Sequence, residues 1–276
     1  MLFARGAWLL VVAVIAGCAV LVGPSAPDGA SGGSPAAARD AVPNRVMTWN
    51  LCNPCDESNV DRAAEIATYA PQVIAVQEAC QNDVARIREY LENLHGLKYH
   101  VEYGTVLRKW SRCGGAPWSP GAYGQAILSA APMTDYEKVE YADGGSEDRG
   151  YMAVTTRVDG RTVRVFNTHL AERRQEEIRA DQANALAKVV AKHRRTIVLG
   201  DFNAVPDAPE LSPMWELAED ADPQCHPSPE LDCEPTTEWQ SKFDYIFLRG
   251  YTPLTHHVRQ SAYSDHYVVY ADLDAK

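Results

Sequence analysis

Short apolar runs, each ended by a turn or by a polar side chain, recur along almost the whole chain and constrain its fold more than any other feature. The runs have the length of β-strands, and helical patterns separate only some of them. The first two strands are expected at 45–50 and 72–77, with helices at 59–69 and 82–94. This β-α-β opening, followed by many more strands, predicts an α/β fold with two sheets packed face to face and helices outside, a four-layer α-β-β-α sandwich.

The remaining expected elements fill the middle and the end of the chain. A hairpin is expected around Asp159 and Gly160, because an Asp-Gly pair between two apolar runs favours a tight turn. A long helix is expected over 172–192. The further expected strands are 123–129, 151–158, 162–168, 196–200, 243–248 and 267–273.

Residues 1–41 are interpreted as an export signal and flexible linker, which leaves 42–276 as the folded domain. Arg5 precedes an uncharged apolar stretch, and a segment rich in Pro, Gly, Ser and Ala follows it. Ile15-Ala16-Gly17-Cys18 is similar to the lipobox of bacterial lipoproteins, in which the cysteine carries a lipid anchor. Free secretion after cleavage near Ala38 is the alternative. Both place the protein outside the cytoplasm, either secreted or lipid-anchored to the cell membrane.

The chain has seven cysteines, of which six follow Cys18. An even number in an oxidising compartment predicts disulfides. Cys225 and Cys233 are the expected pair, because their bond would close a short loop with two prolines and no strand pattern. The other pairings stay open. A thioredoxin-like redox role for Cys52-Asn53-Pro54-Cys55 is the alternative for that motif, and the length of the chain argues against it.

Net charge and the two longest loops bear on the choice of substrate. The formal net charge of −11 argues against a broad basic surface that grips nucleic acid. A metal-dependent site needs positive potential only locally, so a nucleic-acid substrate is not excluded. Segments 106–122 and 206–242 are expected to form the walls that select the substrate. Their tryptophans are interpreted mainly as core residues, with one or two lining a groove as the alternative. They are Trp110, Trp118, Trp215 and Trp239.

Polar side chains suited to metal and phosphate chemistry stand where several expected strands end. One such residue alone is usually a cap or turn residue, but their recurrence indicates function, since strand ends hold side chains on a rigid scaffold. Carboxylate and amide oxygens suit Mg²⁺, Mn²⁺ or Ca²⁺ better than zinc, and histidine titrates in the range needed for proton transfer. The residues at strand ends are Asn50, Glu78, His169, Asp201 and Asn203, and Asp265 and His266 come directly before the last expected strand.

Other residue patterns in the sequence are weaker evidence of function. Ser264-Asp265-His266 contains the residue types of a hydrolase triad, but adjacent residues cannot face one another as nucleophile, base and orienting acid. The sequence has no P-loop, no Rossmann glycine pattern and no His-Glu-x-x-His motif. His256 and His257 are interpreted as a solvent-exposed pair.

Seven blocks around these positions resemble the endonuclease/exonuclease/phosphatase superfamily, which includes deoxyribonuclease I, abasic-site endonucleases, sphingomyelinases and inositol polyphosphate phosphatases. The blocks follow the order of that family and span nearly everything after the leader. Gly-Asp-Phe-Asn at 200–203 together with Ser-Asp-His at 264–266 makes the resemblance specific. The blocks are 47–50, 75–78, 123–129, 166–170, 199–203, 243–246 and 264–266.

The resemblance implies a deoxyribonuclease I-like fold and metal-dependent phosphoester hydrolysis. Glu78 resembles the main metal ligand of the family, with Asn50 and Asp265 as further ligands, and Mg²⁺ or Mn²⁺ is the implied metal, with Ca²⁺ as an alternative. Asp201 and Asn203 are similar to the pair that orients the attacking water and contacts the phosphate.

The remaining roles follow in the same way. His266 is similar to the general base and Asp244 to the residue that orients it, while His169 resembles the histidine that hydrogen-bonds the phosphoryl oxygens. Arg149 is similar to an arginine that reaches the phosphate, and a surface charge beside two acidic neighbours is the alternative. Gln125 stands where the family often has Asn, which leaves the role of this side chain open.

We therefore expect an exported, monomeric phosphoester hydrolase, first of all a nuclease-like phosphodiesterase that acts on DNA or RNA, with no protein partner implied. Because one fold hosts many substrates, a phosphatase or phospholipase C-like hydrolase of a lipid or sugar-phosphate headgroup is the alternative. A catalytically silent binding module is a third reading. The intact set from Asn50 to His266 speaks against it, since a silent protein has no chemical need for those side chains.

Overall fold

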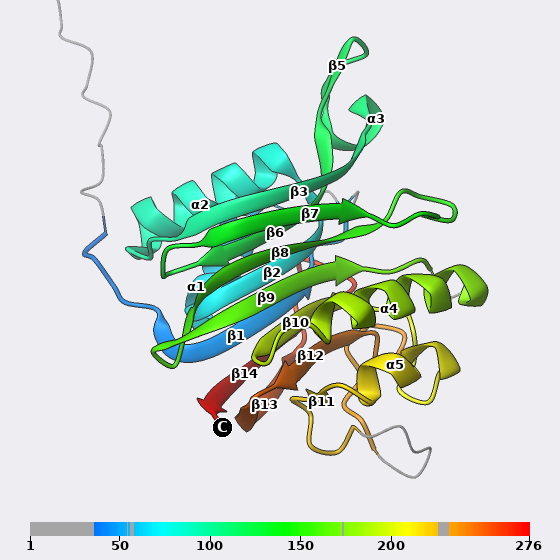
Figure 1. The fold of residues 1–276 in the computed structure, drawn as a ribbon. Helices are drawn as coiled ribbons and strands as arrows, with labels where there is room; N and C mark the ends of the chain where they lie inside the picture. Colours follow the sequence, from blue (N-terminus) through cyan, green and yellow to red (C-terminus); the bar gives the residue numbers. More distant parts are fainter. Residues whose placement is uncertain (1–35, 54, 56–57, 173, 226–231) are drawn as a thin grey trace, which may run out of the picture. The chain divides into compact units, whose positions relative to one another are not determined.

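Two six-stranded β-sheets lie face to face in the computed structural model, with helices on the outer face of each sheet (Figure 1). The predicted export signal, with Cys18, lies outside the residues that the structure describes. No helix within the described ranges is long and apolar enough to cross a membrane. The described residues are 36–53, 55, 58–172, 174–225 and 232–276.

The strand order confirms the predicted four-layer sandwich. The first sheet consists, in order, of β13 (Tyr251–Arg259), β14 (Val268–Ala275), β1 (Val42–Asn50), β2 (Pro71–Cys80), β6 (Ala122–Ser129) and β3 (His100–Arg108). The second sheet consists of β11 (Glu219–Asp220), β12 (Asp244–Arg249), β10 (Thr196–Asp201), β9 (Arg161–His169), β8 (Gly150–Val158) and β7 (Thr134–Glu140).

The helices complete the two outer layers. On the first sheet, α1 (Asn59–Tyr69) and α2 (Gln81–His95) pack against strand residues such as Met47 and Ile74. On the second sheet, α4 (Glu176–Val190) and α5 (Ser212–Trp215) pack against β9, β10 and β12. The first two predicted helices agree with α1 and α2. The predicted helix 172–192 is shorter than expected, because it begins only at Glu176.

The central strands are buried on both faces, which explains why they appear in the sequence as continuous apolar runs. Side chains alternate between the two faces of a strand. Val46 and Val73 therefore face the core between the sheets, while their neighbours Met47 and Ile74 face the helices. The predicted Asp-Gly hairpin is confirmed, with φ of 52° at Asp159 and 64° at Gly160 between β8 and β9.

Buried amides connect the two sheets near the ends of their central strands. Gln77 Nε2 donates to Asn167 Oδ1 at 2.8 Å. Asn167 Nδ2 donates in turn to the carbonyl oxygens of Val76 and Ala126, at 3.0 and 2.9 Å. Gln125, whose role the sequence left open, donates to the Gly150 carbonyl oxygen at 3.0 Å. These bonds fix how the strand ends of one sheet face those of the other.

Three disulfides lie in the described part of the chain. Cys225–Cys233 is the predicted pair, and Cys52–Cys55 and Cys80–Cys113 are the pairs that the sequence left open. Cys80–Cys113 ties the end of β2 to residues 109–121, which we call the arm. Figure 1 shows the arm reaching beyond β3. The arm contains α3 (Trp110–Cys113), β4 (Gly115–Ala116) and β5 (Ser119–Pro120).

Candidate active site

The strand pattern brings the predicted site residues to one end of the sandwich. β1 and β2 are parallel, as are β9 and β10, and the hydrogen bond from Asn50 to Asp201 at 3.0 Å shows that both pairs end on the same side. Their antiparallel partners β14 and β12 begin there. Asp201 is paired in register with His169 on β9 and with Asp244 on β12. Side chains at the same register on neighbouring strands share one face of the sheet, so these three side chains lie together.

Asp201 is the centre of the cluster and is 1% exposed. Its Oδ1 accepts the Asn203 backbone N–H at 2.9 Å, and its Oδ2 accepts Asn50 Nδ2 at 3.0 Å. The same Oδ2 lies 3.4 Å from His169 Nε2 and 3.7 Å from His266 Nε2. Asn50 comes from the first sheet and the other residues mainly from the second, so the cluster spans both sheets.

His266 is held by Asp244, as the sequence predicted for this pair. His266 Nδ1 lies 2.8 Å from Asp244 Oδ2, and Asp244 is fully buried. Thr236 Oγ1 donates to the same Asp244 oxygen at 2.7 Å. The sequence did not indicate Thr236, because it lies in a long segment without periodicity.

The residues around His266 also fix its backbone. Ser264 Oγ donates to the Asn50 carbonyl oxygen at 2.6 Å and accepts the His266 backbone N–H at 3.1 Å. The serine is therefore a structural link between segments and does not face His266 as a nucleophile, in agreement with the sequence analysis. Trp49 Nε1 donates to the His266 carbonyl oxygen at 3.1 Å.

On the other side of the cluster, hydrogen-bond donors surround His169. Arg149 Nη1 lies 3.1 Å from His169 Nδ1, and Asn203 Nδ2 lies 3.0 Å from His169 Nε2. A neutral imidazole has one N–H and one lone pair, so it can accept only one of these two bonds. An oxyanion bound beside His169 and Asn203 would give the competing N–H groups an acceptor. The arrangement is thus suited to phosphoryl oxygens.

Arg149 is 8% exposed, which contradicts the alternative that it is a surface charge. It forms an ion pair with Glu147 at 2.8 Å, and Arg112 forms a second pair with Glu147 at 2.7 Å. The Arg112 guanidinium also lies over the Tyr123 ring, 4.7 Å from its centroid. Sequence reasoning did not identify Arg112 or Glu147, since neither follows a predicted strand.

Glu78 stands at an irregular position of β2. The pairing of β2 with β6 shifts register between Val76 and Ala79, and Glu78 has a φ of 50°, in the left-handed region that non-glycine residues avoid. Strained backbone of this kind costs about 1–3 kcal/mol and occurs mostly at functional sites. The bulge places the Glu78 carboxylate 4.0 Å from His169 Nε2.

The donor atoms around Glu78 fit a hard divalent cation. Within the described residues, Glu78 makes no hydrogen bond, and burial raises the pKa of its carboxyl although the charge of Arg149 lowers it. A cation would relieve the burial of this negative charge. Asn50 Oδ1 already accepts the Cys52 backbone N–H at 2.9 Å, which leaves one lone pair for a metal.

Asp265 is the predicted site residue that stands apart. Its carboxylate lies within 4.8 Å of the sulfurs of Cys52 and Cys55. The Glu238 backbone N–H donates to the Asp265 carbonyl oxygen at 3.0 Å, but the Asp265 carboxylate forms no hydrogen bond or ion pair with any residue that the structure describes. Its charge does raise the pKa of His266. The role of Asp265 as a metal ligand stays a prediction, as do the roles of the other predicted residues.

The two histidines have opposite electrostatic environments. Burial and the charge of Arg149 lower the pKa of His169 well below its ordinary value, so the ring is neutral. Burial also acts to lower the pKa of His266, but the charges of Asp244 and Asp201 outweigh it and raise the pKa to about 10. Burial raises the pKa of Asp201 itself to about 7.

The surroundings of the cluster include a cavity and exposed aromatic side chains. A cavity of about 440 Å³ adjoins Asn203 and is lined by Arg174, Val205 and Phe243 among others. Trp215 packs edge-on against Phe247 and is partly buried against the core, in agreement with the core interpretation. The core interpretation is wrong for the other three tryptophans of the two loops. Trp110, Trp118 and Trp239 are 55%, 88% and 45% exposed.

Comparison with known proteins agrees with this architecture. A family model described as the endonuclease/exonuclease/phosphatase family matches residues 47–266. No curated protein sequence matches the chain. An endonuclease/exonuclease/phosphatase from Beutenbergia cavernae DSM 12333 is 23% identical, with a TM-score of 0.68 over 84% of this chain and 71% of that one.

Two further solved structures have the same fold. The human Nocturnin catalytic domain with bound sulfate is 21% identical, with a TM-score of 0.65 over 85% of this chain and 94% of that one. D. rerio TDP2 in complex with a single-stranded DNA product is 17% identical, with a TM-score of 0.59 over 84% of this chain and 98% of that one.

Proposed function

Because this chain belongs to the endonuclease/exonuclease/phosphatase family of metal-dependent phosphoester hydrolases, we propose that it is an extracytoplasmic, nuclease-like phosphodiesterase. The proposal rests on one observation: three N–H donor side chains lie next to a cluster of carboxylates. The two groups meet where His169 Nε2 lies 3.4 Å from Asp201 Oδ2. The donors suit the oxygens of a phosphate, and the carboxylates suit a cation and a water molecule. Mg²⁺ or Mn²⁺ is the proposed metal.

The donor residues bind and orient the phosphate. Arg149, His169 and Asn203 donate to the phosphoryl oxygens and stabilise the charge that grows on them in the transition state. A divalent cation held by Glu78 and Asn50, with Asp265 as a further candidate ligand, would neutralise the phosphate and polarise its P–O bond.

The carboxylate residues handle the attacking water. His266, placed between Asp244 and Asp201, carries a positive charge, since the two carboxylates raise its pKa. Asp201 Oδ2 is thus better suited than His266 to accept the proton of the water, which revises the base role that the resemblance implied. As the P–O bond breaks, His266 donates its proton to the leaving oxygen, which leaves Asp201 protonated and His266 neutral. Asp244 positions the ring of His266.

Exposed aromatic and basic side chains favour nucleic acid as the substrate. Trp110 and Trp118 project from the arm, and Arg108 and Lys109 at its base are exposed. Aromatic faces stack on unpaired bases, and local cations attract the phosphate backbone despite a net charge of −11. The related fold of D. rerio TDP2 holds a single-stranded DNA product, which supports the same substrate class here.

A substrate panel tests the proposal. Purified protein with Mg²⁺ or Mn²⁺ is expected to cut single-stranded oligonucleotides, and the same preparation of Glu78→Gln serves as control for contaminating nuclease. Plasmid DNA, phospholipid vesicles and p-nitrophenyl phosphate complete the panel. Intact nucleic acid together with hydrolysis of a phospholipid or a phosphomonoester would make the nuclease assignment wrong while the metal mechanism stands.

The cavity beside Asn203 favours one second candidate. Its apolar residues and the exposed Arg174 could hold a compact lipid or sugar-phosphate headgroup next to the reacting phosphate. Arg174→Ala separates the two candidates. It should weaken hydrolysis of a headgroup substrate much more than hydrolysis of an oligonucleotide, which contacts the arm as well.

The proposed location outside the cytoplasm rests on the leader and is supported by the three disulfides, since such bonds persist in oxidising compartments. We propose that the protein is either secreted or anchored through a lipid on Cys18. Cell fractionation distinguishes the two. Wild-type protein in the membrane fraction, with release by Cys18→Ser, indicates the anchor. Wild-type protein found only in the medium, with an N-terminus after Cys18, indicates secretion.

A further inference from the structure

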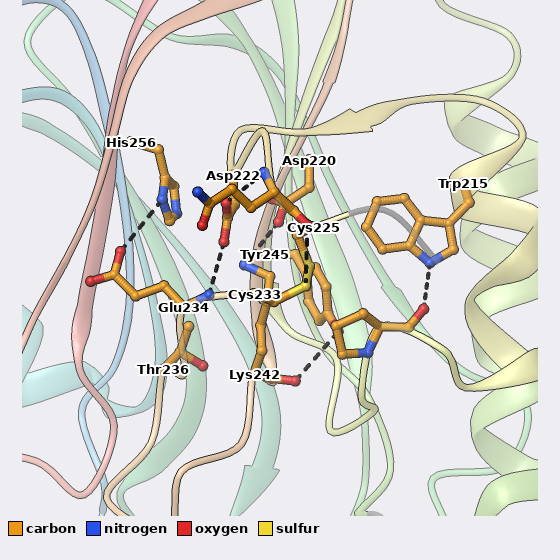
Figure 2. Close-up of a disulfide and its surroundings, with 12 residues drawn as sticks. Trp215, Asp220, Asp222, Cys225, Cys233, Glu234, Thr236, Lys242, Tyr245 and His256 are labelled. Carbon is orange, nitrogen blue, oxygen red and sulfur yellow. Dashed lines mark hydrogen bonds and ion pairs between the residues drawn. A yellow bond between two sulfur atoms is a disulfide. The ribbon is translucent and has the colours of Figure 1, made fainter. Parts of the chain in front are cut away.

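Around the Cys225–Cys233 disulfide lie several charged side chains that are not part of the catalytic cluster (Figure 2). The His256 side chain in this group is only 5% exposed, which corrects the expectation of a solvent-exposed pair. Neighbouring residues on β13 point to opposite faces of the sheet, and His257 contacts Tyr270 and Arg259 instead. The alternation along β13 therefore turns the two histidines to different surroundings.

The Cys80–Cys113 disulfide, by contrast, connects a basic residue of the arm to the catalytic cluster. Cys80 lies two residues after Glu78, at the end of β2, and Cys113 directly follows Arg112. The disulfide therefore fixes the backbone of Arg112 beside the strand that carries the candidate metal ligand.

Arg112 contacts both sheets from this position. Its Nη1 donates to the carbonyl oxygen of Asn53 at 3.1 Å, in the segment that follows Asn50 at the end of β1. Its Nη2 lies 2.7 Å from Glu147 Oε1, and Glu147 comes shortly before β8 of the second sheet. The Arg112 side chain is 28% exposed, so water screens its charge only in part. Arg112 therefore connects the ends of the two sheets beside the cluster.

Glu147 binds two arginines, one with each carboxylate oxygen. Its Oε2 accepts a hydrogen bond from Arg149 Nη1 at 2.8 Å, while its Oε1 faces Arg112. Arg149 Nη1 carries two N–H groups, and it also lies 3.1 Å from His169 Nδ1. Within the described residues, Arg149 Nη2 makes no hydrogen bond. Glu147 thus fixes one end of the Arg149 guanidinium and leaves Nη2 to donate to a phosphoryl oxygen.

The charges of these three side chains also bear on the phosphate. Glu147 alone would neutralise Arg149, whereas one carboxylate shared by two guanidinium groups leaves a net positive charge beside the bound substrate. The Arg149 and Glu147 side chains are 9% and 13% exposed, and ion pairs this far removed from water are sensitive to the loss of a partner. Removal of Arg112 would therefore cancel the net charge and release one oxygen of Glu147.

We propose that Arg112 is a positioning residue for phosphoester hydrolysis: through Glu147 it fixes the orientation of Arg149 and maintains a net positive charge at the phosphate. The inference rests on the proposed function, because that function assigns Arg149 to the phosphate. It gives the arm a second task besides contact with the substrate, since the segment that carries Trp110 also completes the phosphate site.

Steady-state kinetics on a single-stranded oligonucleotide with Mg²⁺ test the role of Arg112. Arg112→Met should lower kcat by at least ~10-fold and change KM little, because a misplaced donor is lost mainly in the transition state. Arg112→Lys keeps the charge and should restore part of the loss. Arg86→Met is the matched control, which removes an exposed arginine of α2 and should leave kcat unchanged.

A double-mutant cycle with Glu147→Gln separates positioning from direct contact. If Arg112 acts through Glu147, Arg112→Met should cost much less in the Glu147→Gln background, where no carboxylate is left to neutralise Arg149. An equal loss in both backgrounds would overturn the proposal, because it would mean that Arg112 contacts the substrate itself. Circular dichroism shows whether each variant folds. Should Arg112→Met fail to fold, Arg112→Gln takes its place in the cycle.

Binding of inorganic phosphate, measured by calorimetry with Mg²⁺, gives a readout without turnover. Wild type and Arg86→Met should bind phosphate equally, and Arg112→Met should bind it several-fold more weakly. This difference in a wild type that hydrolyses nothing on the substrate panel would contradict the proposed phosphodiesterase and support the role of Arg112. An active wild type whose kcat and phosphate binding equal those of Arg112→Met would contradict the role of Arg112 alone. A wild type that neither hydrolyses nor binds phosphate would contradict both.

Discussion

The two sides of the catalytic cluster contain the same residue type in opposite states. On the donor side, Arg149 and Asn203 surround His169, and burial together with the charge of Arg149 lowers its pKa and keeps the ring neutral. On the carboxylate side, Asp244 and Asp201 surround His266 and keep it charged. Both rings are buried, so burial does not account for the difference. The neighbours decide the protonation state, and therefore one histidine is suited to bind an oxyanion and the other to manage a proton.

The largest expected effect comes from Glu78, which lies beside the donor side and is the candidate metal ligand. Glu78→Gln should lower kcat/KM by about 10³-fold or more, because metal stabilisation of the transition state is worth several kcal/mol. EDTA should abolish the activity of the wild type, and Mg²⁺ or Mn²⁺ should restore it. Glu89→Gln, an exposed change on α2, is the control. Full activity in excess EDTA would contradict the metal assignment.

The next effect tests whether the two sides act separately. His266→Ala and His169→Ala should each lower kcat by about 10²–10⁴-fold. Asp244→Asn added to His266→Ala should cost little more than His266→Ala alone, because residues that act as a unit are non-additive. Asp244→Asn added to His169→Ala should be close to multiplicative. Steady-state kinetics of the two double mutants test this. If the losses in kcat are additive in both double mutants, or non-additive in both, the two sides do not act separately.

A smaller effect concerns the dependence of stability on pH, measured by urea unfolding in EDTA. The folded pKa of His266 is raised to about 10, above the ordinary value of 6.5, so its stabilisation is complete below about pH 6.5 and is lost as pH rises toward 10. The folded pKa of His169 is lowered, so its contribution is lost as pH falls below about 6.5.

The variants His266→Gln and His169→Gln should therefore show opposite trends. The stability difference between wild type and His266→Gln should shrink from about pH 6 to about pH 9, while that for His169→Gln should stay constant above about pH 7 and change only in acid. Parallel curves for the two variants would show that the neighbours do not set the two protonation states.

The smallest effect is expected at Thr236, which supports the carboxylate side only. Thr236→Val removes a hydroxyl that donates to Asp244 and accepts two backbone N–H groups, so the free energy of unfolding should fall by about 1–3 kcal/mol. Thr236→Ser keeps the hydroxyl and is the matched control. The stability loss should be smaller when measured in the Asp244→Asn background, since the charged acceptor is then absent. An undiminished loss in that background would show that Thr236 acts only through its backbone contacts.

Sequence reasoning succeeded in the centre of each sheet and failed at the edges. β1, β2, β9 and β10 are buried on both faces, so their residues form apolar runs that are easily detected. Within the two six-stranded sheets, the strands that were not predicted are the outermost ones, β3, β7, β11 and β13. β7, for example, contains one partly buried residue among seven, because an edge strand pairs on one side only and faces solvent.

The same distinction holds for the site. Asn50, His169 and Asp201 end central strands, where the apolar run marks the position of the polar residue that follows. Thr236 and Arg112 lie in segments without periodicity, and only the tertiary contacts with Asp244 and Glu147 indicate their importance. His256 was misinterpreted for a related reason, since its strand was not predicted and the alternation of its side chains was therefore not considered.

The place of β1 between β14 and β2 has a consequence for how the protein is made. The first strand of the domain completes its ladder only with the last, and Trp49 reaches His266 across 217 residues of chain. During synthesis β1 cannot pair with β14 until almost the entire polypeptide has been made. Such pairing between residues far apart in sequence is typical of topologies that fold slowly. A chain that terminates before Val268 would present β1 as an open, apolar edge, so premature termination should yield aggregates rather than a smaller soluble domain.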